Sequence, residues 1–220
     1  MTPVLSAPSI TLMGAGAVTR ADAEDALRHA PVLVCADGGA DHAARFDLVA
    51  DAVIGDLDSA SAAAQEAAGA KLHHISEQES TDFEKCLMAT EAEIYLGVGF
   101  LGGRLDHSLA ALNAMVRRRE KILLIGAEDV MFHVPQSVAL DLPKGSRVSL
   151  FAMDEVTGTE CAGLSWDVTG LTFAPNGKIG TSNKMDGSAL RLSFDKPGML
   201  LLLPRAALDE AVRALRAMPV

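Results

Sequence analysis

The chain has 220 residues, 49% of them apolar, which suits one large domain or two modest ones with a well-filled core. The net charge of -10 disfavours partnership with nucleic acid or an anionic membrane, because both would be repelled, and no apolar run approaches the roughly 20 residues of a membrane helix. Three widely separated cysteines predict neither a disulfide scaffold nor a zinc site, and without a basic leader segment we expect a cytoplasmic protein with no export signal.

Residues 9–126 alternate short apolar runs with stretches of helical periodicity. Strands buried on both faces, as in a parallel sheet, are expected at Ile10–Met13, Val32–Cys35, Ala52–Ile54, Ile94–Val98 and Ile122–Ile125. Helices are expected between them at Thr19–His29, Ser61–Ala68, Thr81–Ala92 and Leu105–Arg118. This alternation predicts an α/β domain with a mainly parallel sheet.

After Gly126 the helical periodicity disappears and short apolar runs recur between turn signals. Antiparallel strands are expected at Val130–Val134, Val138–Leu142, Arg147–Ala152, Leu171–Ala174, Ala189–Phe194 and Met199–Leu203. A helix is expected to close the chain at Arg205–Met218. We therefore predict an α/β domain over residues 1–130 and an all-β, sandwich-like domain with a C-terminal helix over residues 131–220.

The stretch Gly55-Asp56-Leu57-Asp58-Ser59 places two carboxylates directly after the predicted strand Ala52–Ile54. Open α/β sheets keep their ligand sites at the carboxyl ends of strands, and carboxylate oxygens are the hard ligands that a divalent metal prefers. The same pattern is also common turn chemistry, because Asp and Ser hydrogen-bond their own backbone in loops. The stretch alone leaves a metal site and a plain turn both open.

Two further strand ends carry polar residues beside glycine pairs. In Asp37-Gly38-Gly39 the exposed N–H groups suit anionic oxygens, although a capped loop explains the pattern equally well. In Gly102-Gly103-Arg104-Leu105-Asp106-His107 a guanidinium stands at a helix N-terminus, which favours a phosphate, and the histidine could donate to it. Arg104 and Asp106 could instead cap the helix, but the convergence of polar groups favours a functional role.

A predicted helix start supplies a third acid. Thr81 and Glu84 have the spacing of a capping box, a structural role that explains both residues. Asp82 and Lys85 lie three residues apart and share a helix face, which offers an acid for a metal and a cation for a phosphate. With Asp56 and Asp58, Asp82 would complete a three-carboxylate site for magnesium.

Six segments together resemble a known family. They are Ala36–Ala40, Ile54–Ser59, Ser80–Leu87, Gly102–His107, Gly163–Trp166 and Thr181–Asn183. Their order and spacing are similar to those of the thiamine pyrophosphokinases, and the resemblance covers nearly the whole chain. It implies transfer of a pyrophosphoryl group from ATP to the hydroxyl of thiamine, which gives thiamine diphosphate and AMP, with magnesium as cofactor. It also implies a homodimer with its active sites between the subunits.

The resemblance also implies roles for individual residues. It implies catalytic roles for Asp56, Asp58, Asp82, Lys85, Arg104 and Asp106, with magnesium on Asp56, Asp58 and Asp82. It implies ATP contacts at Asp37, Gly38, Gly39, Lys85, Arg104, Asp106 and His107. It implies thiamine contacts at Gln78, Trp166, Ser182 and Asn183. Trp166, the only tryptophan, would stack on a cationic heteroaromatic ligand, whereas its residue type alone favours a core position.

Two other functions stay open from the sequence. The first is pyrophosphoryl transfer to another heterocyclic alcohol, such as a pterin, which Trp166 with Ser182-Asn183 disfavours. The second is a sensor that binds thiamine or a nucleotide without turnover. A sensor has no need of every phosphate-handling group, so the intact set of acids and cations favours an enzyme.

Overall fold

The computed structural model describes residues 2–118 and 120–218, which form two compact units. Over its described residues, the first unit spans residues 2–114 and 124–127, and the second spans residues 115–118, 120–123 and 128–218. Helix α5 (Leu105–Arg117) and strand β8 (Lys121–Ile125) each contribute residues to both units. The assignment of residues 1–130 and 131–220 to two domains stays a prediction.

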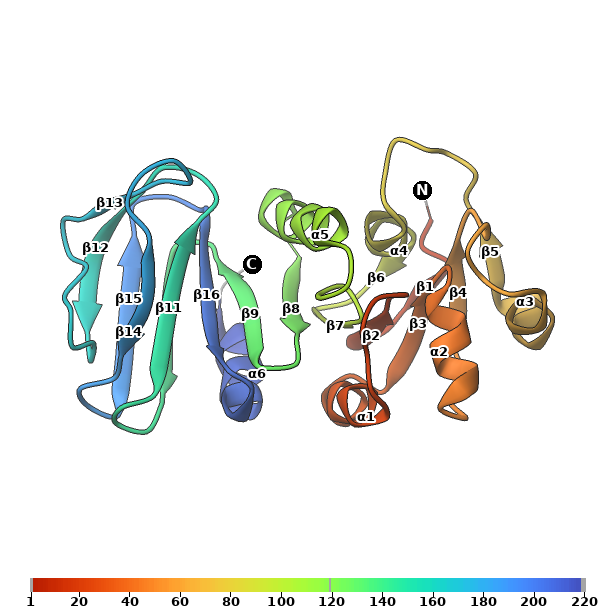
Figure 1. The fold of residues 1–220 in the computed structure, drawn as a ribbon, viewed down its shortest axis with the longest axis horizontal. Helices are drawn as coiled ribbons and strands as arrows, with labels where there is room; N and C mark the ends of the chain where they lie inside the picture. The colour runs from red at the N-terminus through yellow and green to blue at the C-terminus, as the bar shows by residue number, and fades with distance from the viewer. Residues whose placement is uncertain (1, 119, 219–220) are drawn as a thin grey trace. The chain divides into compact units, whose positions relative to one another are not determined.

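A parallel sheet forms the centre of the first unit, with strand order β7-β2-β3-β4-β5 (Figure 1). Its strands are β2 (Ser9–Met13), β3 (Val32–Ala36), β4 (Ala52–Gly55), β5 (Leu72–His74) and β7 (Ile94–Val98). A separate parallel pair joins β1 (Leu5–Ser6) to β6 (Thr90–Glu91). Strands β2, β4 and β7 are buried along their whole length, as expected of parallel strands covered on both faces. The predicted α/β architecture with a mainly parallel sheet is confirmed.

Helices connect these strands, and several of them pack on the sheet. They are α1 (Arg20–His29), α2 (Gly39–Arg45), α3 (Ala62–Ala68), the short 3₁₀ turn η1 (Gly69–Lys71), α4 (Asp82–Ala89) and α5. Thr81 caps α4 with Glu84 in a capping box, as predicted. The predicted extension of α4 to Ala92 is wrong, because Thr90 and Glu91 leave the helix to pair with β1. Helix α2 and strand β5 were not predicted.

The second unit contains two antiparallel sheets, with strand orders β14-β11-β16-β9 and β10-β15-β12-β13. The strands are β9 (Asp129–Val134), β10 (Ser137–Asp141), β11 (Arg147–Ala152), β12 (Val156–Ala162), β13 (Thr172–Phe173), β14 (Gly180–Lys184), β15 (Ala189–Phe194) and β16 (Met199–Pro204). Side chains alternate between buried and exposed along β10 and largely along β15, so one face of that sheet turns to the core. The predicted β-rich second half is confirmed, although β12 and β14 were not predicted.

The chain ends in the 3₁₀ turn η2 (Arg205–Ala207) and helix α6 (Leu208–Ala217). The predicted helix start at Arg205 is therefore the start of the 3₁₀ turn. Helix α6 packs on β9 and β10 and buries apolar side chains, including Val212 and Leu215. None of the described helices is long and apolar enough to cross a membrane.

The turn from β3 into α2 brings two backbone segments into contact at Gly39. A Cβ atom on Gly39 would lie 2.0 Å from the carbonyl oxygen of Met13, at the end of β2. That distance is far inside van der Waals contact, and the atom concerned belongs to the backbone, which cannot swing aside. Gly39 is therefore required for packing, whatever ligand the loop binds.

We expect Gly39→Ala to lower the free energy of unfolding by about 3 kcal/mol, because the added methyl group overpacks β2 against α2. Chemical denaturation measures the change. The control is Gly187→Ala, at an exposed glycine whose Cβ would meet no atom within 4 Å, and it should change stability by less than about 0.5 kcal/mol. Equal changes in the free energy of unfolding for the two substitutions would contradict the close approach of Gly39 to the Met13 carbonyl oxygen.

Candidate active site

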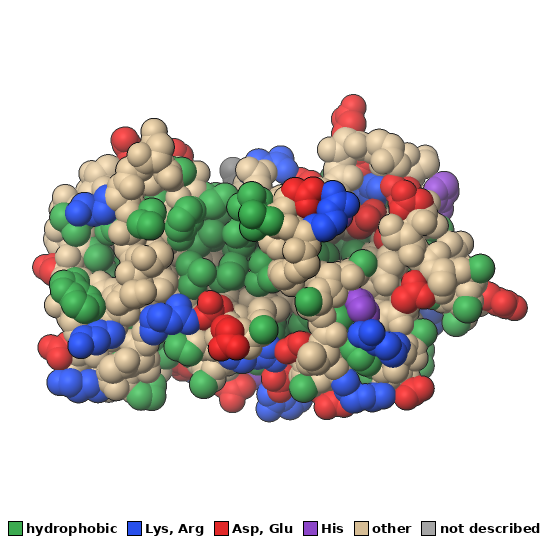
Figure 2. Space-filling model, in the orientation of Figure 1, with side chains coloured by type: hydrophobic (Ala, Val, Ile, Leu, Met, Phe, Trp, Pro, Cys, Tyr) green, Lys and Arg blue, Asp and Glu red, His purple; other side chains and the backbone are tan. Residues whose placement is uncertain are grey.

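Acidic side chains converge at the carboxyl ends of β3 and β4. Asp37 follows β3 directly, Asp56 and Asp58 follow β4, and Asp82 is the first residue of α4. In Figure 2 acidic and basic side chains lie beside one another on the first unit, near the loop that joins β5 to α4. The sheet thus brings together four of the acids singled out in the sequence.

Asp37 is the most deeply buried of these acids and organises the loop after β4. Its side chain accepts hydrogen bonds from the backbone N–H groups of Ser59 (3.1 Å) and Ala60 (2.9 Å). Burial raises the pKa of Asp37, and the nearby charges of Asp82 and Asp56 add to that effect, while the two backbone hydrogen bonds oppose it. Its backbone is left-handed, with φ of 43°, which Asp tolerates better than most residues.

Lys85 is a buried cation between two of the carboxylates. Only 2% of the residue is exposed, and its Nζ lies 3.1 Å from Asp56 Oδ2 and 3.1 Å from Asp82 Oδ1. Burial alone would lower the pKa of Lys85, but hydrogen bonds and charges from Asp82 and Asp56 outweigh burial and raise it. The prediction that Asp82 and Lys85 share a helix face is confirmed, and the ammonium group joins the start of α4 to the end of β4.

Asp56 accepts two side-chain hydrogen bonds on the same oxygen. Gln78 Nε2 donates to Asp56 Oδ2 at 2.8 Å, alongside Lys85. The hydrogen bond from Gln78 lowers the pKa of Asp56, and Lys85 lowers it further. Asp56 is therefore held as a carboxylate at neutral pH. The predicted contact of Gln78 with thiamine stays a prediction, and in this structure its amide contacts Asp56.

A group of three acids has the donor chemistry of a metal site. Asp37, Asp56 and Asp58 each offer a carboxylate oxygen, and these atoms all lie within 4.8 Å of one another. Such hard oxygen ligands fit Mg²⁺, which keeps several waters and takes few protein ligands. Asp37 belongs to this group, whereas Asp82, which was predicted in its place, bonds Lys85. The set Asp56, Asp58 and Asp82 stays a prediction.

Arg104, Asp106 and His107 lie at the start of α5. The Arg104 guanidinium contacts Asp106 through two hydrogen bonds, of 3.2 and 2.6 Å, and both side chains are largely exposed. The hydrogen bond from Arg104 lowers the pKa of the Asp106 carboxyl group. The same contact raises the pKa of the Arg104 guanidinium group. Exposed ion pairs contribute little free energy, so Arg104 can exchange this carboxylate for a phosphate at small cost.

His42 connects α2 to the loop that follows β2, a role that the sequence did not predict. Its Nε2 lies 3.1 Å from the carbonyl oxygen of Gly16, and its Nδ1 lies 2.9 Å from Arg45 Nη2. A carbonyl only accepts and a guanidinium only donates, so the neutral tautomer with hydrogen on Nε2 satisfies both contacts. No spacing signals the contact of this histidine with the loop, because the carbonyl oxygen of Gly16 belongs to backbone distant in sequence.

The residues predicted to contact thiamine in the second half meet around β14. Trp166 is 58% exposed, so a core position for it is wrong. Asn183 Oδ1 accepts from the backbone N–H of Trp166 at 3.2 Å, and Asn183 Nδ2 donates to the Trp166 carbonyl at 2.8 Å. Lys184 Nζ lies 5.7 Å from the centroid of the Trp166 ring. The backbone of Trp166 is thus fixed while its ring faces outward.

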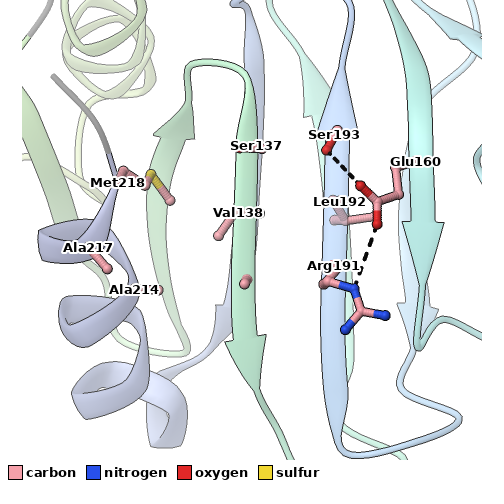
Figure 3. Close-up of a pocket in the computed structure, with 10 residues that line it drawn as sticks. Ser137, Val138, Glu160, Arg191, Leu192, Ser193, Ala214, Ala217 and Met218 are labelled. Carbon is pink, nitrogen blue, oxygen red and sulfur yellow. Dashed lines mark hydrogen bonds and ion pairs between the residues drawn. The ribbon is translucent and has the colours of Figure 1, made fainter.

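A pocket of about 310 Å³ lies elsewhere in the second unit, between α6 and the sheet that contains β10 and β15 (Figure 3). Its polar side chains pair with one another: Glu160 accepts from Ser193 at 3.3 Å and lies 3.6 Å from Arg191. None of the predicted site residues lines this pocket. We therefore do not assign it to the active site.

The chain thus combines an α/β unit, with a cluster of acids and one lysine at the carboxyl ends of its strands, and a β-rich unit. Two family models match the chain: the catalytic domain of thiamin pyrophosphokinase at residues 23–125, and the vitamin B1 binding domain of thiamin pyrophosphokinase at residues 130–199. The chain belongs to the thiamin pyrophosphokinase family, whose members are kinases of thiamine diphosphate biosynthesis.

Individual relatives agree with this assignment. Thiamine pyrophosphokinase 1 of Oryza sativa subsp. japonica is 27% identical over 210 residues, which cover 76% of this chain and 80% of the relative. Thiamine pyrophosphokinase 1 of Arabidopsis thaliana is 25% identical over 209 residues, with 76% of each chain covered. The fold is similar to thiamin pyrophosphokinase from Candida albicans, with a TM-score of 0.77, 17% identity and coverage of 89% of this chain and 88% of that one.

We expect Lys85→Met to strengthen binding of Mg²⁺ or Mn²⁺ about tenfold without nucleotide, because the variant loses the cation that neutralises Asp56 and Asp82. Turnover should fall, since the same ammonium orients both acids. Titration calorimetry measures the first effect and AMP formation the second. The control is Lys144→Met, which removes an exposed partner of Asp186 and should alter neither. Weaker cation binding by Lys85→Met would contradict the placement of the metal site at the acids beside Lys85.

Proposed function

We propose that the protein transfers the β,γ-pyrophosphoryl group of ATP to the hydroxyl of thiamine. The hydroxyl oxygen forms a bond to the β-phosphorus, the bond from that phosphorus to the α,β-bridging oxygen breaks, and AMP leaves while the hydroxyl proton is released. The main support is the buried Lys85 between Asp56 and Asp82, in a chain of this family. With a divalent cation on its carboxylates, such a cluster would orient a polyphosphate, and positioning with charge neutralisation supplies most of the catalysis in this chemistry.

The first unit would bind the nucleotide and its magnesium. Asp37, Asp56 and Asp58 would hold Mg²⁺, which neutralises charge on the phosphates when bound. Lys85 keeps Asp56 and Asp82 in fixed positions, while Arg104 and His107 supply donors to phosphate oxygens at the start of α5. The glycines of the Asp37-Gly38-Gly39 turn let backbone approach the same ligand closely.

The second unit would bind thiamine. Trp166 offers an exposed ring for stacking on a cationic heterocycle, and Asn183 of β14 binds its backbone, with Ser182 next to Asn183 in that strand. We further propose that the protein is a cytoplasmic homodimer in which the nucleotide unit of one subunit works with the thiamine unit of the other. The exposed apolar side chains of Leu105 (72%) and Leu109 (53%), on the helix that begins with the phosphate motif, support a partner surface there.

The reaction is tested by incubating the protein with ATP, Mg²⁺ and thiamine and measuring AMP and thiamine diphosphate. We expect the two products in equal amounts, and only when thiamine is present. Asp56→Asn should reduce kcat at least about 100-fold while the protein stays folded by circular dichroism, because one ligand and one partner of Lys85 are lost. AMP formed only with a pterin alcohol, or tight thiamine binding without AMP, would contradict the proposal.

The shared active site is tested by mixing two variants at a thiamine concentration so low that neither is active alone. Asp56→Asn damages the first unit, and Trp166→Ala damages the second, where it should mainly raise the KM for thiamine. If each site uses one unit from each subunit, a mixed dimer contains one site with both units intact. Mixing and exchanging the subunits should therefore restore activity that neither variant has alone. No recovery, with subunit exchange confirmed by mass spectrometry, would place both units of a site in one chain.

A further inference from the structure

Strand β14 contains a bulge opposite Ser149 of β11. Val148 pairs with Asn183 and Leu150 pairs with Gly180, so β14 has one residue more than β11 between these two pairs. Thr181 and Ser182 are consequently both exposed, whereas neighbours in a regular strand point to opposite faces. Bulges of this kind re-aim side chains, and this one lies in the segment predicted to contact thiamine.

The Ser149 hydroxyl holds the bulge in place. Ser149 is buried, with 5% of the residue exposed, and its Oγ accepts from the backbone N–H of Ser182 at 3.0 Å. Arg147 Nη1 donates to the same oxygen at 3.2 Å, and Arg147 also contacts Asp129. Ser182 has a φ of 64°, an uncommon backbone conformation for a residue with a side chain, which persists only where the surroundings fix it.

The bulge decides which side chains of β14 turn inward. Asn183 is 6% exposed, and its amide binds both backbone groups of Trp166. If the same residues paired without a bulge, the register would slip by one and Asn183 would point away from Trp166. The contact from Ser149 to Ser182 is therefore linked, through the direction of Asn183, to the presentation of the exposed Trp166 ring.

We propose that Ser149 is a positioning residue that sets the affinity for thiamine without touching it. It fixes the bulge at Ser182, the bulge directs Asn183 inward, and Asn183 holds the backbone from which Trp166 faces the ligand. The proposal rests on the proposed function, because it concerns the thiamine end of the same site. It assigns no role to Ser149 in nucleotide binding.

Trp166 is the only tryptophan in the chain, so intrinsic fluorescence reports directly on this position. We expect Ser149→Ala to raise the Kd for thiamine, measured by fluorescence quenching, about tenfold, because the backbone N–H of Ser182 loses its acceptor. The Kd for ATP should change less than about twofold. Ser149→Thr keeps the hydroxyl and should restore binding. The matched control is Ser193→Ala, on β15 in the same unit, which should change neither constant.

The proposal is overturned if Ser149→Ala leaves the affinity for thiamine unchanged, or if it lowers the affinities for ATP and thiamine equally. Should that variant fail to fold, Arg147→Met removes one donor to the Ser149 hydroxyl from a partly exposed position. This variant should also weaken thiamine binding, but to a smaller extent. An unchanged Kd for thiamine would overturn the proposal. Wild-type protein that binds thiamine without forming AMP contradicts the proposed reaction alone. Wild-type protein that binds no thiamine contradicts both.

Discussion

The site depends on one buried charge, the Lys85 ammonium group between Asp56 and Asp82. A buried cation without partners is strongly unfavourable, so this lysine fixes the end of β4 against the start of α4. Gly55 makes the approach sterically possible, because a Cβ there would lie 2.8 Å from the Asp37 Cβ and 3.2 Å from Asp82 Oδ1. Fold and site are therefore stabilised by the same contacts, and neither acid can move far independently.

Much of the α/β unit could be predicted because its signals are local. Apolar runs marked the buried strands, and Thr81 with Glu84 marked the start of α4. Asp82 and Lys85 could be placed on one face from helix geometry alone. What could not be predicted depends on distant backbone: Asp37 joins Asp56 and Asp58 because β3 and β4 are neighbours, and its conformation is left-handed. The contact of Gln78 with Asp56 likewise spans 22 positions of sequence.

The β-rich unit was harder to predict in the region that carries its site. Strand β14 reads Gly-Thr-Ser-Asn-Lys, with no apolar alternation to mark it, and a bulge breaks the period of two that identifies strands. Trp166 shows the opposite difficulty: its residue type favours the core, yet pairing of its backbone with Asn183 leaves the ring exposed. Residue type alone could not decide between a core position and an exposed position for Trp166.

The bulge in β14 also lets this strand carry one residue more than its partner between two matched pairs. Deleting one residue between Gly180 and Asn183 would let the strand pair regularly with β11, with Asn183 still opposite Val148 and still facing inward. One of the two adjacent exposed side chains, Thr181 or Ser182, would be lost. The bulge therefore adds an exposed side chain to this segment while Asn183 keeps its inward face, and the loss of a single residue there would remove that side chain.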